Sequence, residues 1–289
     1  MIAVKTMSAL LGAEITGIDL SLDIDQKTFD RIVDIFHEHA VIVFRGQNLT
    51  SRQHVAFSRR FGDLWTSTVQ TKFNKPDCPE VLILSNILKD GQPIGVRDAG
   101  PYWHTDLCFL PRPSRATMLH AKEIPVQDGV ALGDTIFSSV TAAYDALPAE
   151  MKSRLAGLKA VHSYNYTYEQ KVRDFKLRNA LKTDEKRWMP EDVLHPVVRT
   201  HPFTGRKGLY VNEAYTTHIV GIPKTESDAI LKQLFEHVTR PEFTYRHKWQ
   251  VGDFLMWDNC PTQHKAVMDY ALPLRRLMER TTVVGEETF

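Results

Sequence analysis

Residues 252–285 read GDFLMWDNCPTQHKAVMDYALPLRRLMERTTVVG, and this stretch contains two strand-like pieces joined by a turn and a basic segment. The first piece, GDFLMWD at 252–258, is followed by a turn rich in Asp, Asn and Pro. His264 comes next, and a segment with paired arginines leads into the second piece, RTTVVG at 280–285. Short apolar runs bounded by turn residues are typical of antiparallel β-structure. This end of the chain therefore predicts a sandwich or a barrel.

The rest of the chain carries more pieces of this kind, together with amphipathic helices. Further strand-like runs occur at 40–44, 80–87, 116–124 and 208–212. Helical periodicity or capping residues mark 26–39, 50–62, 138–147, 148–158 and 225–238. Because the two kinds of element do not alternate regularly, a doubly wound parallel sheet is less favoured than an antiparallel core decorated by helices. We predict a mainly β fold with flanking helices.

The chain shows no sign of a division into separate domains. It contains no internal repeat, no low-complexity tract and no Gly/Ser/Pro-rich linker, so we predict that residues 1–289 form a single domain. Residues 163–195 interrupt the strand pattern with a charged, aromatic insertion. This insertion is either a solvated excursion or a lid over a pocket, and the sequence favours neither.

Composition excludes several classes of protein. Lys and Arg number 36 against 35 Asp and Glu among the 289 residues, so the formal net charge is +1 and an extended phosphate-binding surface has little support. No run approaches the roughly 18 apolar residues of a membrane span, and no persuasive signal peptide is present. The three cysteines fit neither a disulfide framework nor a zinc site. We expect a cytoplasmic protein with no nucleic-acid or membrane partner.

Two histidines and one aspartate are candidates for metal chemistry. His104 and Asp106 are one residue apart in PYWHTDLCF, and on a strand both side chains would point to the same side. Alone, this pair is more often a satisfied polar contact than a metal site. His264 strengthens the prediction of a metal site. Two histidines and one carboxylate leave three positions open on iron, whereas a structural zinc site is closed by four ligands. The other ten histidines are predicted to have surface or hydrogen-bonded core roles.

Three arginines, Arg275, Arg276 and Arg280, follow His264. Arg276 and Arg280 are four residues apart, which places them on one face of a strand. One interpretation is a solvated, charged edge strand without a functional role. The functional interpretation is an anchor for a carboxylate, since the planar guanidinium matches a carboxylate with two parallel hydrogen bonds.

Several segments together resemble the TauD/TfdA (taurine dioxygenase) family of Fe(II)- and 2-oxoglutarate-dependent dioxygenases. The strongest likenesses are WHTD, the GDT at 133–135, WDNCPTQH and RRLMERTTVVG, in that order. FRGQNLT, RRFGDL and HPVVRTHPFTGRKGLYVN extend the resemblance over most of the chain. The resemblance implies a double-stranded β-helix (jelly-roll) core and an oxidoreductase that hydroxylates a small molecule while 2-oxoglutarate and O₂ are converted to succinate and CO₂.

The resemblance also implies roles for particular residues. Fe(II) is expected on His104, Asp106 and His264, and the distal carboxylate of 2-oxoglutarate on Thr135 and Arg276, because the RR-x-M-x-R pattern selects Arg276 over its neighbour. Arg280 is expected near the cosubstrate or near an anionic group of the primary substrate. Retention of the Asp106 carboxylate implies hydroxylation rather than halogenation. A homo-oligomer, dimer or tetramer, is the family expectation.

The substrate is where the chain departs from taurine dioxygenase. Ser67, Gln70 and Gly100 stand where that enzyme has His, Tyr and Asn, so taurine itself is not expected. A small organic anion is the predicted substrate class. Candidate pocket residues, chosen by nearness to the motifs in chain order and each more often a packing residue, are Asn86, Tyr102, Leu107 and Phe203.

Two other functional classes remain open at this point. One is a catalytically silent jelly-roll binding protein, which would be expected to have lost a ligand or the arginine anchor. The other is a cupin-like isomerase or hydrolase that uses another divalent metal.

Overall fold

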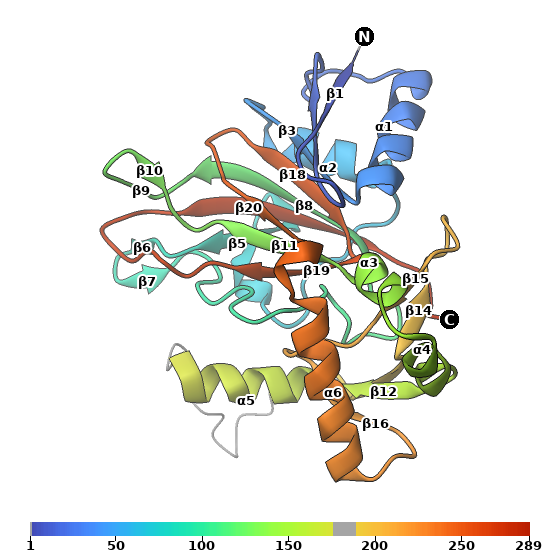
Figure 1. The fold of residues 1–289 in the computed structure, drawn as a ribbon. Helices are drawn as coiled ribbons and strands as arrows, with labels where there is room; N and C mark the ends of the chain where they lie inside the picture. Colours follow the sequence, from blue (N-terminus) through green and yellow to red (C-terminus); the bar gives the residue numbers. More distant parts are fainter. Residues whose placement is uncertain (1, 176–188) are drawn as a thin grey trace.

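The computed structural model describes residues 2–175 and 189–289, and two facing sheets form its centre (Figure 1). The major sheet has the strand order β1-β2-β3-β18-β8-β20-β5-β4 and the minor sheet the order β17-β11-β19. The major-sheet strands are β1 Ala3–Thr6, β2 Ala13–Thr16, β3 Val41–Phe44, β4 Asn74–Lys75, β5 Cys78–Ser85, β8 Ser114–Glu123, β18 Phe254–Asp258 and β20 Leu277–Val284. The minor-sheet strands are β11 Thr135–Ser139, β17 Thr244–His247 and β19 Thr262–Ala266.

Pairing between distant segments gives this core its topology. β20 lies between β8 and β5, and β18 lies between β3 and β8, all in antiparallel register, while β2 and β3 pair in parallel. The two pieces of 252–285 that resemble strands thus enter the same sheet on either side of β8. The arrangement is a helix-flanked double-stranded β-helix, which confirms the predicted fold class.

The two faces of the major sheet have different neighbours because side chains alternate along a strand. On β18, Phe254 and Met256 pack outward in a cluster with α1 (Gln26–His39) and α2 (Ser51–Arg59). Leu255 and Trp257 point inward and pack with Phe137 of the minor sheet. The inner face therefore encloses the space between the sheets, and the outer face lies under the two helices.

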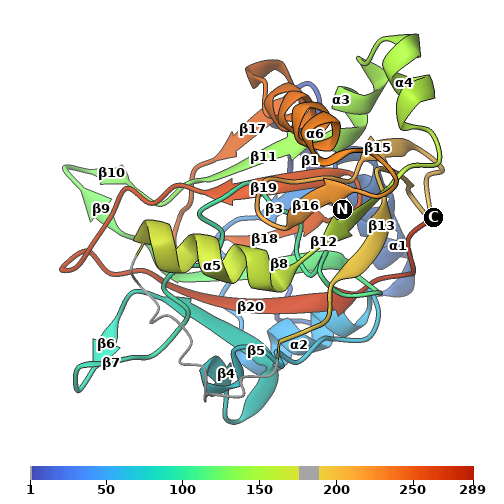
Figure 2. The same ribbon diagram turned by 90° about the horizontal axis from the view of Figure 1, so that it is seen from below.

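The predicted helices form where their local signals place them. α1 has the predicted bounds 26–39, and α2 begins after Thr50, whose hydroxyl and the Gln53 side chain make a reciprocal capping box. The remaining predicted helices are α3 (Val140–Asp145), α4 (Ala149–Leu155) and α6 (Lys224–Val238). Figure 2 shows α2 and α6 on opposite sides of the sheets. None of the helices in the described chain is long and apolar enough to cross a membrane.

The first part of the 163–195 insertion is helix α5 (Tyr164–Phe175), which lies below the sheets in Figure 1 and crosses in front of them in Figure 2. Tyr164, Tyr168 and Lys171 are buried on this helix, so it is not a solvated excursion. Residues 176–188 of the insertion lie outside the described residues. Near its end the insertion forms β13 (Val193–Pro196), which pairs with β12 (Lys159–His162).

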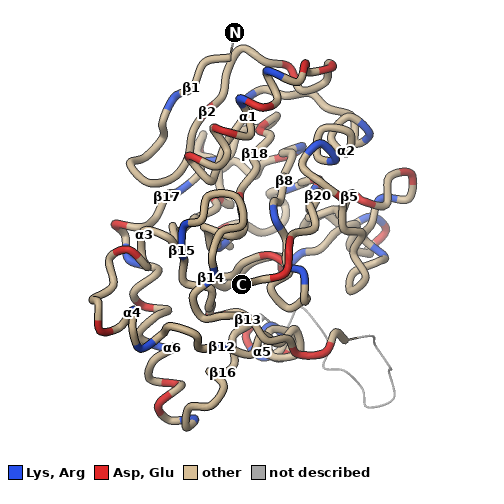
Figure 3. The backbone as a smooth tube through the Cα atoms, turned by 90° about the vertical axis from the view of Figure 1, so that its right-hand side faces the viewer, with Lys and Arg blue, Asp and Glu red and all other residues tan. Residues whose placement is uncertain are grey.

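The remaining strands are short and lie outside the two central sheets. β12 pairs on its other side with β16 (Thr216–Ile219), and together with α3, α4 and α6 this sheet encloses a second apolar cluster. The other pairs are β6 (Leu88–Lys89) with β7 (Gln92–Pro93), β9 (Val126–Gln127) with β10 (Val130–Ala131), and β14 (Val198–Thr200) with β15 (Lys207–Leu209). Figure 3 shows positive and negative residues interspersed along the described chain.

Candidate metal and cosubstrate site

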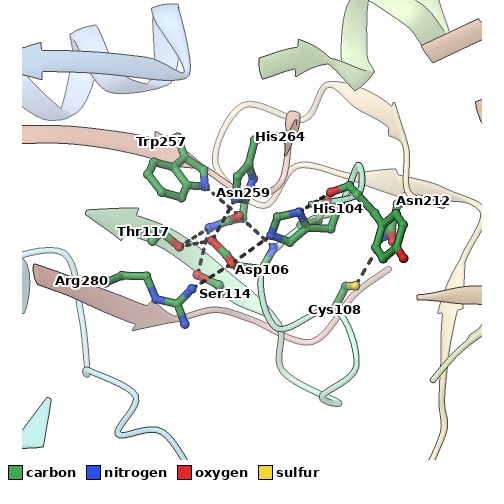
Figure 4. Close-up of polar contacts among 12 residues, drawn as sticks. His104, Asp106, Cys108, Ser114, Thr117, Asn212, Trp257, Asn259, His264 and Arg280 are labelled. Atoms are coloured by element: carbon green, nitrogen blue, oxygen red, sulfur yellow. Dashed lines mark hydrogen bonds and ion pairs between the residues drawn. The ribbon is translucent and has the colours of Figure 1, made fainter. Parts of the chain in front are cut away.

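His104, Asp106 and His264 come together between the two sheets (Figure 4). His104 Nε2 lies 3.7 Å from Asp106 Oδ1, and His264 Nε2 lies 3.7 Å from Asp106 Oδ2. The two imidazole rings are 4.1 Å apart between centroids. All three side chains are buried. One carboxylate thus faces two histidine nitrogens at distances too long for hydrogen bonds.

The local backbone differs from the predicted strand. Only His104 is strand-like, through an isolated antiparallel bridge to His264 of β19, whereas Asp106 lies in a turn and Leu107 has φ 54°. The prediction that His104 and Asp106 share a strand face is therefore wrong. Their side chains converge because the chain turns sharply after the bridge.

The donor set fits a divalent ion held by one carboxylate and two neutral histidines. His104 Nδ1 donates to the Tyr102 carbonyl at 2.9 Å, which leaves the Nε2 lone pair facing Asp106. Ligand atoms about 2.1 Å from a shared ion lie roughly 3 Å or slightly more from each other, so the 3.7 Å separations need only a small contraction. Three protein ligands leave positions open for other molecules, as in iron oxygenase sites.

Hydrogen bonds from the strand β8 and the turn after β18 orient Asp106. Thr117 Oγ1 donates to Asp106 Oδ2 at 2.7 Å and accepts from Asn259 Nδ2 at 3.0 Å. The Asn259 Oδ1 atom accepts from the Asp106 amide and from Trp257 Nε1, both at 3.2 Å. Partners of this kind fix the orientation of a metal ligand. Sequence reasoning missed Thr117 and Asn259, although Asn259 lies in the quoted WDN turn.

Neighbouring groups keep the Asp106 carboxylate ionised, and burial keeps the His264 imidazole neutral. Burial raises the pKa of Asp106, but the two facing histidines and Arg280 more than offset it, so this pKa is held well below its usual range. Arg280 Nη1 lies 3.4 Å from Asp106 Oδ1. Burial, reinforced by His104, lowers the pKa of His264 to about 3. Both protonation states are those that a metal requires of its ligands.

Arg276 is a buried cation with no ion-pair partner among the described residues. It is 8% exposed, and its Nη1 donates to the Gly133 carbonyl. Its guanidinium lies 5.7 Å from the Trp249 ring and 5.5 Å from the Tyr270 ring. Burial lowers the pKa of Arg276, which is the sign of a desolvated charge. Thr135 lies close by, because its Oγ1 accepts from Trp249 Nε1 at 3.1 Å.

The three arginines lie in two different environments. Arg276 and Arg280 both line the cavity that contains His104, whereas Arg275 is exposed and pairs with Glu123 at 3.0 Å. β20 has neighbours on both sides, so the alternative interpretation of a charged edge strand is wrong.

Of the five substrate candidates, Leu107 and Arg280 line this cavity, and the other three do not. Asn86 instead bonds the backbone before β20, accepting from the Arg276 amide at 2.9 Å. The Tyr102 hydroxyl donates to Asp174 at 2.6 Å. Phe203 is 48% exposed and stacks on His37, with 5.2 Å between ring centroids. Nearness in chain order to the motifs did not translate into nearness to the cavity for these three.

Other residues that line the cavity come from segments that the candidate list omitted. α5 contributes one face, with Tyr164, Thr167, Tyr168 and Lys171 at helical spacing. Further lining residues are Trp65, Val69, Gln70, Val96, Arg97, Gly100 and Phe109. The charged, aromatic composition of the 163–195 insertion was the available signal for α5, and Gln70 and Gly100 had already been noted as departures from taurine dioxygenase.

Gly100 offers a test of the ligand geometry. Its φ is 71°, and an added Cβ would lie 2.9 Å from His104 Cε1. We expect Gly100→Ala to displace the imidazole and to weaken Fe(II) binding by roughly 10- to 100-fold, the cost of losing an orienting contact around a metal. Equilibrium dialysis measures this change.

Gly91→Ala is the matched control, since Gly91 has φ 75° and open space around its missing Cβ. It introduces the same backbone strain far from any metal ligand. Equal Fe(II) affinities for the two variants would contradict the role given to His104.

Comparisons with known proteins find relatives that match nearly the whole chain. Residues 3–282 match the sequence model of the family described as "Taurine catabolism dioxygenase TauD, TfdA family". Pentalenolactone F synthase from Streptomyces arenae is 34% identical over 286 residues, covering 96% of this chain and 94% of that protein. The alpha-ketoglutarate-dependent 2,4-dichlorophenoxyacetate dioxygenase of Cupriavidus pinatubonensis is 33% identical over 296 residues, covering 99% of this chain and 98% of that protein.

A solved structure shares the architecture over its full length. The crystal structure of AAD-2 in complex with Mn(II) and N-oxalylglycine has a TM-score of 0.80 against this chain at 30% identity, and the match covers 100% of this chain and 99% of that one.

Proposed function

This chain belongs to the TauD/TfdA family of Fe(II)- and 2-oxoglutarate-dependent dioxygenases, and on that premise we propose that His104, Asp106 and His264 hold its iron. The observation that carries the assignment is the buried cluster in which one carboxylate faces two histidine nitrogens at 3.7 Å. The chain is an oxidoreductase. In this proposal residues 1–289 act as one domain, because the iron ligands come from two distant segments, 104–106 and 264.

When bound, iron would activate O₂, the oxidant, which would convert 2-oxoglutarate to succinate and CO₂ with one oxygen atom and hydroxylate the substrate with the other. The protein side chains do the positioning. Thr117 and Asn259 hold the Asp106 carboxylate in place, and the Tyr102 carbonyl fixes the His104 tautomer. Burial between the sheets excludes water from the reacting groups.

Arg276 and Thr135 bind the distal carboxylate of 2-oxoglutarate. The support is a buried guanidinium that has a carbonyl contact but no carboxylate partner among the described residues, in the same cavity as the proposed iron ligands. A planar guanidinium donates two parallel hydrogen bonds to a carboxylate. Thr135 adds a hydroxyl whose oxygen accepts from Trp249, so its proton remains available for donation.

The primary substrate is a small organic anion with an apolar or aromatic body. Trp65, Phe109 and Tyr164 supply aromatic walls to the cavity, and Arg97 and Lys171 supply positive charge. Aromatic walls take an apolar body, and a cation at the margin orients an anionic group. Gln70 and Gly100, which stand where taurine dioxygenase has Tyr and Asn, line the same cavity.

A panel of aryloxy acids, alkyl sulfates, sulfonates and amino-acid derivatives tests this function. Succinate is measured after incubation with Fe(II), 2-oxoglutarate and O₂, with iron-free protein as the control. We expect iron-dependent succinate release to rise with anionic compounds that carry an apolar body and to stay at background with taurine. Equal stimulation of succinate release by uncharged analogues of the same compounds would contradict the proposed anionic substrate class.

Lys171 provides a sharper test of anion recognition. Its Nζ donates to the Asp98 carbonyl at 2.9 Å and lies 3.9 Å from the Asp98 carboxylate, so the ammonium is held at the cavity wall. We expect Lys171→Met to raise the KM for an anionic substrate by roughly 10-fold, the effect of one charge-assisted hydrogen bond, without changing the KM for 2-oxoglutarate.

Arg173→Met is the control on the same helix, because Arg173 is exposed and bonds Asp174. Its KM values should match those of the unmodified protein. If Lys171→Met changed both KM values in parallel, the residue would have a structural role rather than one in substrate binding.

A further inference from the structure

A second group of potential metal ligands lies on the outer face of the major sheet, under α2. His54 of α2, His120 of β8 and Glu279 of β20 each offer one ligand atom, and these three atoms lie within 4.8 Å of one another. The residues are 0%, 1% and 6% exposed. His120 and Glu279 are direct cross-strand partners, so both side chains face α2. From the sequence, both histidines are predicted to have surface or hydrogen-bonded core roles.

Hydrogen bonds determine which nitrogen of His120 carries the proton. Its Nε2 lies 3.0 Å from the carbonyl oxygen of Gln47, which can only accept, so Nε2 donates. In the neutral ring Nδ1 then carries a lone pair. No described residue donates to this atom, which is buried.

A chain of hydroxyl groups gives His54 the same tautomer. Ser58 Oγ donates to the His54 carbonyl at 2.8 Å, so it accepts from Thr281 Oγ1 at 2.7 Å. Thr281 Oγ1 in turn accepts from His54 Nε2 at 2.9 Å. The lone pair of His54 therefore also lies on Nδ1, and this atom is buried with no partner among the described residues.

Glu279 retains acceptor capacity. Its Oε1 accepts from Lys75 Nζ at 2.9 Å and from Ser51 Oγ at 3.0 Å. Within the part of the chain that the structure describes, Oε2 accepts only from Ser51, at 2.9 Å. A carboxylate accepts about four hydrogen bonds in all. The three residues of the cluster thus carry two unpartnered nitrogen lone pairs and a partly satisfied carboxylate. Buried acceptors without donors are costly.

We propose that His54, His120 and Glu279 form a second metal site that takes a divalent ion of the Zn(II) type. Two imidazole nitrogens favour zinc over Mg²⁺ or Ca²⁺, which prefer oxygen ligands. Lys75 and Lys122 bring positive charge near the cluster and limit its affinity for a cation. The Lys75 side chain is 31% exposed and contacts Glu279 Oε1, which leaves Glu279 Oε2 for the metal.

The second site is separate from the iron site. Glu279 and Arg280 are adjacent on β20, so their side chains leave opposite faces of the sheet, and Arg280 contacts Asp106 on the inner face. An ion on the outer face would join α2 to the sheet at β8 and β20. The three ligands are buried away from the substrate cavity, so the ion would link these elements rather than take part in catalysis. Three protein ligands are one fewer than in a closed structural zinc site, so a water molecule would complete the coordination.

Metal stoichiometry tests the proposal independently of catalysis. An Asp106→Ala/His264→Ala variant removes two of the proposed iron ligands and keeps the second cluster intact. After dialysis against Zn(II) and removal of loosely bound ions, elemental analysis should find one zinc per chain in this variant. Its Tm should also rise with Zn(II). No bound zinc and no rise in Tm would overturn the proposal.

Further substitutions locate the ion. Adding His54→Gln to this variant should abolish both the bound zinc and the rise in Tm, and Glu279→Gln should do the same. His218→Gln, at an exposed histidine, is the control that should keep the zinc. Retention of zinc in the His54→Gln and Glu279→Gln proteins would place the ion elsewhere and overturn the assignment.

Discussion

Asp106→Ala is expected to abolish iron-dependent release of succinate. Asp106 is the only carboxylate in the inner cluster of the described residues, and it faces both His104 and His264. Without it, two neutral histidines must hold a divalent ion beside the cationic Arg280. Loss of a partner that merely orients a ligand costs roughly 10- to 100-fold in affinity or activity, so loss of the ligand itself should cost more.

Iron content and succinate formation are both measured for this variant. Asp63→Ala, at an exposed aspartate, is the control and should retain both properties. Turnover of 2-oxoglutarate that is unchanged in the Asp106→Ala protein would show that the ligand assignment is wrong.

Arg276→Ala is expected to raise the KM for 2-oxoglutarate by roughly 10²- to 10⁴-fold. Two charge-assisted hydrogen bonds at about 1.5–3 kcal/mol each are lost, and each 1.4 kcal/mol is tenfold. The KM for the primary substrate should change much less, because the guanidinium lies between Gly133, Trp249 and Tyr270 rather than beside α5. Arg276→Lys should restore part of the affinity, since an ammonium lacks the planar fork.

The neighbouring arginine is a matched control for this experiment. Arg275 is exposed and paired with Glu123, so Arg275→Ala removes the same charge one residue away without opening the cavity. Its KM for 2-oxoglutarate should stay near that of the unmodified protein. A larger rise in the KM for 2-oxoglutarate in Arg275→Ala than in Arg276→Ala would show that Arg275, not Arg276, binds the carboxylate.

Local signals predicted most of the helices and strands. The apolar spacing of 26–39 and the capping residues at Thr50 and Gln53 depend on neighbours within a few positions, so α1 and α2 lie where the sequence indicates. The strand prediction failed at 104–106, where a turn with Leu107 at positive φ replaces regular pairing. That conformation depends on the bridge to His264, which lies far away in the chain.

The site was predictable only where a motif carried it. The three proposed iron ligands and the two cavity arginines stand in recognisable segments, and the structure brings them together. Thr117 reaches Asp106 from β8, and no local pattern reveals that contact. Asn86 and Phe203 were chosen by chain order, but tertiary packing determines where they lie. Asn86 bonds the backbone amide of Arg276, just before β20, and Phe203 stacks on His37.

The association of the two histidines under α2 likewise could not be predicted from local sequence. His54 and His120 stand in no ligand motif, and their association with Glu279 depends on the register between β8 and β20 and on how α2 packs over them. Surface or hydrogen-bonded core roles are therefore what the sequence predicts for both, and the metal site is inferred from their buried, unpartnered nitrogens.

Anaerobic addition of Fe(II) and 2-oxoglutarate, followed by visible absorption, tests the central claim most directly. The account predicts a weak charge-transfer band in the unmodified protein, no band in Asp106→Ala, and a band that requires far more 2-oxoglutarate in Arg276→Ala. A band of unchanged intensity and 2-oxoglutarate dependence in both variants would contradict the proposed iron and cosubstrate site.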